Sequence, residues 1–514
     1  MLNLSIPASR LFVFITISMG VIASILLSIW SITIDDVINN DGIVYIRAAE
    51  LWSRGDWQAA LGVYKWPFYP WLIMVFSDAL GISFKTAGHV LNTTFFSLVV
   101  VFFVQTVRAF GGRSRMAIII AMLIALLHPA FNEYRAFLIR DPGYLAAYLL
   151  GIYSLVCYRW SLRVRYSVFA ILSFLVASLF RVEGLVFLFA IPILLLVSYS
   201  GSTKWPWLRY MFSLSLILVL GCVLGGWFIV TEDGPVGLLL LQDPLAVLVE
   251  GWSQIRMGID EKLLIFEEQF LGPYSTGYAY LLFVLTALNV ILSSIVFELE
   301  IPYVVLVGYG LYSHSLAKDQ RLKRLWASFI VINLGILTVF VLIMLFLAPR
   351  YPLAMTITIL IAAPLILEKL ISNIRNQQIK KIGKFFLIVL AIWALGESYS
   401  GLSNFTRAEH LRDAGYWLYD KTEKTSGPIL TNNRKIAFYA SQKGVRDVLT
   451  INNGIPVSEI PNLVKELGCD FAGIRVKRDD IFLESELRKA IKSKPVSVIE
   501  NEHGDRVLLY DLRG

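Results

Sequence analysis

The chain alternates long apolar runs with short polar loops from its start to about residue 398. A helix that crosses a hydrocarbon core about 30 Å thick needs roughly 20 apolar residues. By this criterion the runs predict membrane-spanning helices near residues 11–33, 88–107, 116–130, 143–158, 166–180, 183–200, 210–230, 278–297, 326–348, 352–367 and 385–398. We therefore expect about eleven crossings. The apolar run 300–313 is then either a re-entrant segment, or another run has been miscounted. The predicted number of crossings therefore extends to about thirteen.

The pattern changes after residue 398 to that of an ordinary globular domain. Helical periodicity is present over 405–421, 434–441, 457–467 and 482–492, and strand-like runs occur at 428–431, 471–476, 496–499 and 507–510. The predicted fold class is a polytopic α-helical membrane domain over residues 1–398, followed by a small extracytoplasmic α/β domain over residues 399–514.

Composition and charge agree with this division. Hydrophobic residues make up 57% of the chain and charged residues 16%, which is far from a soluble globular average. The net charge of +8 does not indicate a nucleic-acid partner, because the basic residues lie in short loops between apolar runs. The positive-inside rule makes the side that carries these loops cytoplasmic. These loops hold Arg108, Arg113, Arg115, Arg159, Arg163, Arg165, Lys204, Arg209, Lys318, Arg321, Lys323, Arg324, Lys369, Arg375, Lys380, Lys381 and Lys384.

This orientation places the N-terminus in the cytoplasm and the tail outside, in a bacterial-type inner (plasma) membrane. The loops 34–87, 131–142 and 231–277 then lie outside as well. The first run is expected to be a retained helix, because only Arg10 precedes it and no small-residue cleavage site follows.

Several kinds of chemistry have no support in the sequence. The three cysteines comprise Cys157 and Cys222 in apolar runs and Cys469 in the tail, which predicts neither a disulfide framework nor a metal cluster. The five histidines are scattered without metal-ligand spacing. No nucleotide-binding motif occurs in a usable context.

The first outer loop carries the most informative pattern. From Asp41 onward, helical spacing predicts an amphipathic helix on the membrane surface. Its apolar face comprises Val44, Tyr45, Ala48, Ala49 and Trp52, and its charged face comprises Arg47, Glu50 and Arg54. Asp41 is a candidate general base that takes the proton from an attacking hydroxyl. The alternative is that Asp41, Asn39 or Asn40 only caps the helix. Asp35 and Asp36 are weaker candidates for the base.

Basic residues recur on the outer side, where the positive-inside rule disfavours them. They are Lys65, Arg135, Arg140, Arg181 and Arg350. Three of them have a structural explanation: Lys65 lies in an aromatic interfacial segment, and Arg181 and Arg350 can each form a helix-terminal ion pair. Asp141 before Pro142 likewise forms an ordinary helix start. Together, however, the five cations are the arrangement expected if a lipid-linked phosphate is held on this face.

Five segments resemble the GT-C superfamily of polyprenyl-phosphate-sugar glycosyltransferases, including protein O-mannosyltransferases and the lipid A aminoarabinose transferase (family 39-like). They are D-G-I-V-Y-I-R-A-A-E at 41–50, K-W-P-F-Y-P at 65–70, R-D-P-G-Y at 140–144, F-R-V-E-G at 180–184 and R-Y-P at 350–352. The resemblance spans most of the membrane part.

The resemblance implies an inverting sugar transfer from an isoprenoid phosphate to an acceptor hydroxyl. Asp41 would be the base, and Asp141 a second acid that orients the acceptor or a metal. Lys65 with Arg181 or Arg350 would clamp the phosphate, and Tyr45 and Tyr351 join the expected substrate-binding set.

The sequence departs from the family pattern at two positions. Gly42 replaces a second acid, and Tyr64 replaces a glutamate that binds metal in some members. A divalent cation is therefore possible as a cofactor, but no tight metal site is evident.

The expected partners are the lipid bilayer, a polyprenyl-phosphate sugar donor, and a glycan, lipid or protein acceptor. Three alternatives remain: a transporter or flippase of lipid-linked sugars, a non-catalytic scaffold, and a GT-C polymerase or ligase that uses a diphosphate-linked oligosaccharide. Against a transporter, the sequence shows no paired inverted halves.

Overall fold

The computed structural model describes residues 7–197, 213, 216, 221, 244–313, 319–376, 381–403, 408–422, 428–441, 448–450, 464, 466, 468–491 and 494–513. The chain divides into two compact units. Unit 1 comprises Met1–Ile29, Val90–Arg135 and Arg140–Asn404, and unit 2 comprises Trp30–His89, Ala136–Ile139 and Phe405–Gly514.

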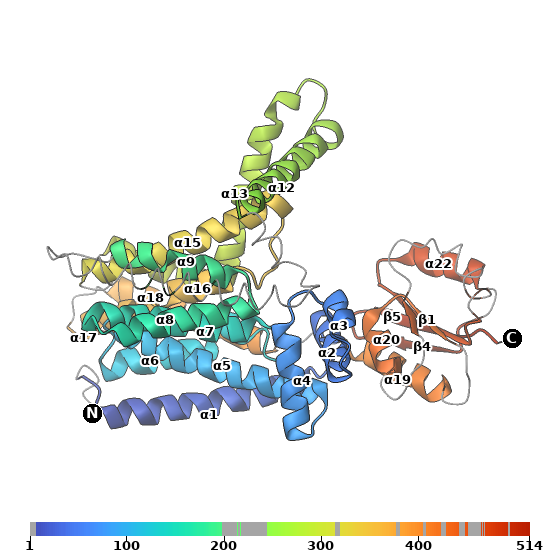
Figure 1. Ribbon diagram of the computed structural model, residues 1–514, viewed down its shortest axis with the longest axis horizontal. Coiled ribbons are helices and arrows are strands. Elements are labelled where there is room, and N and C mark those ends of the chain that lie inside the picture. The colour runs from blue at the N-terminus through green and yellow to red at the C-terminus, as the bar shows by residue number, and fades with distance from the viewer. Residues whose placement is uncertain are drawn as a thin grey trace. The chain divides into compact units, whose positions relative to one another are not determined.

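Unit 1 is built of helices. Its helices include α1 (Arg10–Ile34), α5 (Phe84–Ala109), α6 (Arg115–Leu127), α7 (Asp141–Ser161), α8 (Val164–Phe180), α9 (Glu183–Val197), α13 (Ala279–Leu299), α15 (Gln320–Met344) and α18 (Lys381–Ser403). Helices α16 (Leu353–Leu360) and α17 (Ala363–Arg375) follow each other closely. Figure 1 shows α7, α8 and α9 side by side, and each contacts the next along the chain. Among the described residues of both units, six helices or helix pairs are long and apolar enough to cross a membrane, and five shorter helices are also apolar.

Most expected spans of unit 1 coincide with helices. The span predicted at 210–230 lies outside the described residues. The run 300–313 forms a helix, α14 (Ile301–Tyr312), which begins after Glu300 at a positive φ of 64°. The region 231–277, expected as a loop between two spans, contains the helix α12 (Pro244–Ile265) in its described part. Gly258 permits close packing of α12 on α15, because a Cβ there would lie 3.2 Å from the carbonyl oxygen of Ile343.

Unit 2 combines the segment 34–87, expected to be the first outer loop, with the C-terminal tail. This segment forms helices α2 (Asn40–Ser53), α3 (Trp57–Val63) and α4 (Phe68–Leu80). The tail forms helices α19 (Glu409–Thr422), α20 (Arg434–Ser441) and α22 (Ile481–Ala490). Its strands are β1 (Ile429–Thr431), β2 (Val448–Thr450), β3 (Phe471–Val476), β4 (Ser497–Glu500) and β5 (Arg506–Asp511).

The five strands form one mixed sheet in the order β2-β1-β3-β5-β4. Strand β1 pairs in parallel with β2 and β3, with Leu430 opposite Ala472, whereas β5 is antiparallel to β3 and β4. The tail is therefore the small α/β domain that the sequence predicts.

One hydrophobic core of unit 2 is shared by segments that are far apart in the sequence. It joins Val37, Ile38 and Ile46 of the first outer loop, Leu138 of the second, and tail residues. The tail contributes Ala408, Leu411, Ala414, Leu418, Ile429, Ile436, Tyr439, Ala440, Phe471, Val507 and Leu509. Because α2 begins beside this core, the tail domain and the helix that carries Asp41 form one packed body.

Candidate functional site

A pocket opens in unit 1 at the start of α7. Its lining comes from α7, the α8–α9 junction, α15 and the segment that enters α16. The lining residues are Asp141, Tyr144, Leu145, Arg181, Glu183, Asn333, Ile336, Leu337, Phe340, Arg350, Tyr351, Leu353 and Ala354. Four charged side chains in a wall that is otherwise aromatic and aliphatic are typical of a pocket for a polar ligand.

Local sequence places the charged groups at helix ends. Asp141 is the first residue of α7, with Pro142 behind it, and Glu183 opens α9. Arg181 follows α8 in an extended conformation and still donates its backbone N–H to Ala177. Gly184 is required next, because a Cβ there would lie 2.3 Å from the backbone nitrogen of Ser178. The tight α8–α9 turn therefore aims Arg181 and Glu183 toward Asp141.

Arg181 is bonded to both carboxylates. One terminal nitrogen pairs with Asp141 and the other with Glu183, and its Nε donates to Glu183 Oε1 at 3.1 Å. The guanidinium lies over the rings of Tyr144, at 5.7 Å, and Tyr351, at 5.0 Å. Arg181 and Asp141 are 5% and 3% exposed, so these charges are buried but paired. The guanidinium of Arg181 and the carboxylates of Asp141 and Glu183 carry a formal net charge of −1.

Arg350 and Tyr351 complete this group of predicted residues. Both line the pocket, and the ring of Tyr351 packs 4.5 Å from that of Phe340. Arg140 is the N-cap residue of α7 and lies close enough to Glu183 for an electrostatic interaction, although it does not line the pocket. The structure thus brings Asp141, Arg181, Arg350 and Tyr351 together.

Arg135 lies in the interior and does not line this pocket. It is 1% exposed, and its guanidinium donates to Asn132 Oδ1 at 2.6 Å and to Ser28 Oγ at 2.8 Å. It also bonds the backbone and side-chain oxygens of Ser24 and lies over the ring of Phe96. Its Nε and one terminal nitrogen are thus engaged inside unit 1, and the phosphate contact expected of Arg135 stays a prediction.

Asp41, Tyr45 and Lys65 belong to unit 2. Asp41 lies half-buried in the first turn of α2. The ring of Tyr45 is buried and makes edge contacts with Tyr64 at 4.9 Å and Tyr69 at 5.1 Å, so it holds α2 against α4. Lys65 is exposed between α3 and α4.

Helix α2 has the predicted extent and amphipathic character. Its buried residues are Gly42, Tyr45, Ile46, Ala48 and Ala49. Asn39 occupies the N-cap position, but its side chain instead exchanges hydrogen bonds with the main chain of Leu138 at 3.1 and 2.8 Å. Asp41 is consequently in the first turn rather than at the cap.

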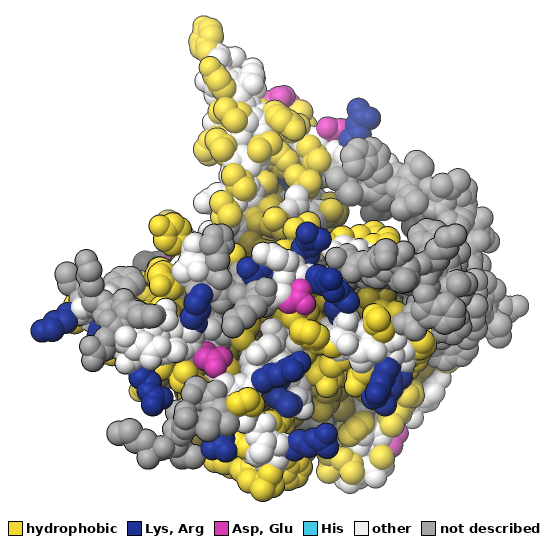
Figure 2. Space-filling model, turned by 90° about the vertical axis from the view of Figure 1, so that its left-hand side faces the viewer, with side chains coloured by type: hydrophobic (Ala, Val, Ile, Leu, Met, Phe, Trp, Pro, Cys, Tyr) yellow, Lys and Arg dark blue, Asp and Glu magenta, His cyan; other side chains and the backbone are white. Residues whose placement is uncertain are grey.

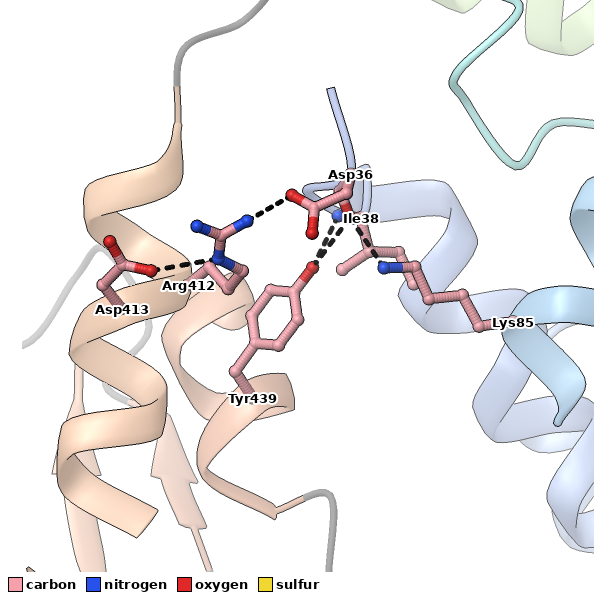
Figure 3. Close-up of polar contacts among 6 residues, drawn as sticks. All are labelled: Asp36, Ile38, Lys85, Arg412, Asp413 and Tyr439. Atoms are coloured by element: carbon pink, nitrogen blue, oxygen red, sulfur yellow. Dashed lines mark hydrogen bonds and ion pairs between the residues drawn. The ribbon is translucent and has the colours of Figure 1, made fainter. Parts of the chain in front are cut away.

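Asp35 and Asp36 have structural partners in unit 2. Asp35 is 6% exposed and lies near enough to Lys435 to affect its pKa. The carboxylate of Asp36 forms an ion pair with Arg412 of α19 (Figure 3). Asp36 therefore anchors this segment to the tail, and both residues stay weaker candidates for the base.

Sequence reasoning missed the polar residue Asn333, which lines the pocket from the apolar helix α15. Its amide donates to the hydroxyl of Tyr148 at 2.8 Å. An asparagine within an apolar span is itself a signal of an interior polar site. Within the described ranges, no three His, Cys, Asp or Glu side chains are arranged to hold a metal ion. A divalent cation therefore stays a prediction.

Solved structures with this fold are GT-C membrane glycosyltransferases, and the chain has the fold of these multi-pass proteins. The oligosaccharyltransferase of Archaeoglobus fulgidus with a tethered acceptor peptide superposes with a TM-score of 0.56 and 13% identity, over 96% of this chain and 74% of that one. The apo form of the same enzyme superposes with a TM-score of 0.52 and 14% identity, over 90% of this chain and 70% of that one.

The mycobacterial arabinofuranosyltransferase AftD aligns over 99% of this chain and 40% of its own, with 14% identity and a TM-score of 0.45. No protein-family model and no curated protein matches the chain. The expected fold class is confirmed, whereas identities this low show the fold alone.

Proposed function

We propose that this protein is a membrane glycosyltransferase that moves a sugar from a polyprenyl-phosphate donor to an acceptor hydroxyl on the non-cytoplasmic face. The observation that carries the proposal is the pocket, where Asp141, Arg181, Glu183 and Arg350 converge in a chain with the GT-C fold. Aromatic walls with carboxylates and guanidinium groups suit a sugar phosphate. Aromatic rings pack on the C–H faces of the sugar, and the charged groups form hydrogen bonds with its hydroxyls and its phosphate.

The position of the pocket along α7 supports an outer-face reaction. Asp141 begins α7 and Arg159 lies near its end. A helix of 21 residues is about 30 Å long, which is the thickness of the hydrocarbon core. Figure 2 shows many Lys and Arg side chains gathered on one face. The basic loop at the end of α7 is cytoplasmic by the positive-inside rule, and the pocket then lies at the opposite side of the membrane.

The proposed reaction is an inverting displacement. The acceptor hydroxyl oxygen bonds to the anomeric carbon, the bond from that carbon to the phosphate oxygen breaks, and polyprenyl phosphate leaves with the electron pair. Asp41 takes the hydroxyl proton as general base. Arg350 of the pocket supplies positive charge for the leaving phosphate, and Lys65 has the phosphate-binding role that the family resemblance implies. The guanidinium of Arg181 also holds the carboxylates of Asp141 and Glu183 in place.

The test measures transfer of radiolabelled sugar by purified protein from polyprenyl-phosphate donors. Asp41→Asn is expected to lower kcat by roughly 10²–10⁴-fold, the usual contribution of a general base. Asp78→Asn is the matched control, because Asp78 is an exposed acid of the same outer loop, and it should keep full activity. Equal activity in both variants would eliminate Asp41 as the base.

A donor linked through diphosphate is the second candidate, favoured by the likeness in fold to an oligosaccharyltransferase. The same assay with diphosphate-linked oligosaccharides separates the two donor classes. Transfer from the diphosphate donor alone would reassign the substrate. Donor translocation without transfer would instead indicate a transporter.

A further inference from the structure

The segment directly before Asp41 is held by the C-terminal domain within unit 2. Figure 3 shows Arg412 and Tyr439 of the tail reaching Asp36 and Ile38. Arg412 forms an ion pair with the carboxylate of Asp36, and the Tyr439 hydroxyl accepts the N–H of Ile38 at 2.9 Å. The same hydroxyl lies 3.3 Å from the carbonyl oxygen of Asp36, to which it donates.

Further contacts fix the same few residues. Lys85 donates its Nζ to the carbonyl oxygen of Asp36 at 2.6 Å. Val37 and Ile38 are each 3% exposed in the shared core. Asn39 is paired with the main chain of Leu138. Every residue from 36 to 39 is thus restrained by a side chain or by the core of unit 2.

The restraint continues on the other side of Asp41. Gly42 is closely surrounded, because a Cβ there would lie 2.8 Å from Asn39 Oδ1 and 3.0 Å from the Cβ of Leu138. Asn40 is exposed and Asp41 half-buried between these fixed neighbours. The backbone that carries the Asp41 carboxylate therefore has little freedom to shift.

Arg412 and Tyr439 together form a clamp on residues 36–38. The electrostatics of this clamp agree with a stable ion pair between Arg412 and Asp36. Burial alone would lower the pKa of Arg412, but hydrogen bonds and charge interactions with Asp413 and Asp36 raise it above its ordinary value. Burial also raises the pKa of the Tyr439 hydroxyl to about 12, so this group is neutral and can donate to Asp36 while it accepts from Ile38.

We infer that Arg412 and Tyr439 are positioning residues for the reaction: the C-terminal α/β domain fixes the start of α2 and thereby the carboxylate of Asp41. This inference rests on the proposed function, in which Asp41 is the base. A displacement of about 1 Å at a catalytic group can cost roughly 10²-fold in rate, so a clamp that acts only through the backbone has a measurable effect on kcat.

The kinetic test compares Arg412→Ala and Tyr439→Phe with the wild type. Each should lower kcat by roughly 10- to 100-fold and leave the donor KM within about twofold, because the clamp touches no substrate. Arg412→Lys should recover part of the rate. Asp36→Ala combined with Arg412→Ala should be no worse than Arg412→Ala alone, as expected for partners in one interaction.

Arg506→Ala is the matched control. Arg506 pairs with Glu484 at 2.9 Å in the same domain, away from the outer loop, and its loss should leave kcat unchanged. Wild-type kcat in both Arg412→Ala and Tyr439→Phe would overturn the inference. If both variants keep wild-type kcat while Asp41→Asn abolishes transfer, the inference about Arg412 and Tyr439 is wrong and the proposed function stands.

A spin label reports on the restraint without any assay of activity. It is attached at Asn40→Cys in protein whose Cys157, Cys222 and Cys469 are replaced by serine. Arg412→Ala should increase label mobility, whereas Arg506→Ala should not. Unchanged mobility with Arg412→Ala overturns the clamp even if the wild type transfers no sugar, so failure of the clamp and failure of the proposed function are told apart.

Discussion

The guanidinium of Arg181 bonds to the carboxylate of Asp141, forty residues earlier in the chain, and ties the start of α7 to the turn between α8 and α9. The same guanidinium also bonds Glu183 at the start of α9. Three helices therefore meet at one buried cation, and the floor of the pocket depends on it.

Removal of Arg181 is expected to destabilise unit 1. Arg181→Met leaves the buried carboxylate of Asp141 and the half-buried carboxylate of Glu183 without their cation, and breaking a buried pair typically costs about 3–5 kcal/mol. The thermal midpoint in detergent should fall clearly. Val182→Ala is the control, since Val182 is 56% exposed beside it and should change little.

A variant that also neutralises the carboxylates of Asp141 and Glu183 provides a second check of the ion pairs of Arg181. The triple variant Arg181→Met, Asp141→Asn, Glu183→Gln should be more stable than Arg181→Met alone, because no unpaired charge stays buried. A triple variant that unfolds at a lower temperature than the single variant would contradict this account of the pocket floor.

Arg350 is expected to affect donor binding rather than folding. It lines the pocket, is half-buried, and lies in a connecting segment between α15 and α16. Arg350→Gln should raise the donor KM by roughly tenfold, since a charge-assisted hydrogen bond contributes about 1.5–3 kcal/mol. Steady-state kinetics with varied donor measure this change. Arg165→Gln, at an exposed position in a basic loop, is the control; an equal KM in the two variants would remove Arg350 from the donor site.

A buried hydrogen-bond network next to the pocket should contribute to stability. The hydroxyl of Tyr148 is bonded to Asn333 and to Thr358 Oγ1, both at 2.8 Å, and Tyr148 is 0% exposed. Tyr148→Phe leaves an N–H of Asn333 without this acceptor, at a cost of about 1–3 kcal/mol. Thermal unfolding should show the loss, and Asn333→Leu added to Tyr148→Phe should recover part of it. Additive losses would mean that the two side chains are independent.

The sequence predicted the helices and the tail domain well, because apolar runs and strand-like runs are local signals. Helix α2 and the start of α7 at Asp141 are two such cases. The partners of individual charges were not predictable in the same way. Arg135 and Arg350 look alike as outward cations, yet one is buried against Ser24 and Ser28 and the other lines the pocket. The pairing of Asp36 with Arg412 joins residues 376 positions apart, and no local pattern contains that information.

The last prediction concerns pH and Glu300, at the junction of α13 and α14. Burial, together with the nearby carboxylates Glu397 and Glu133, raises the pKa of Glu300 to about 7 in the folded protein. Glu298 lies two residues before it and is 8% exposed, so this junction carries several acids. The folded state therefore binds a proton on Glu300 more tightly than the unfolded state does. For a raised carboxyl pKa, the stabilisation is fully present below the ordinary pKa of about 4.3 and is lost as the pH rises toward 7.

Glu300→Gln cannot ionise, so it should raise the thermal midpoint at pH 8 and leave that at pH 4 nearly unchanged, when both are compared with the wild type in the same detergent. Glu409→Gln, at an exposed position on α19, is the control and should show no such difference. A Glu300→Gln midpoint that follows the wild type at both pH values would show that Glu300 is ionised without cost in the folded state.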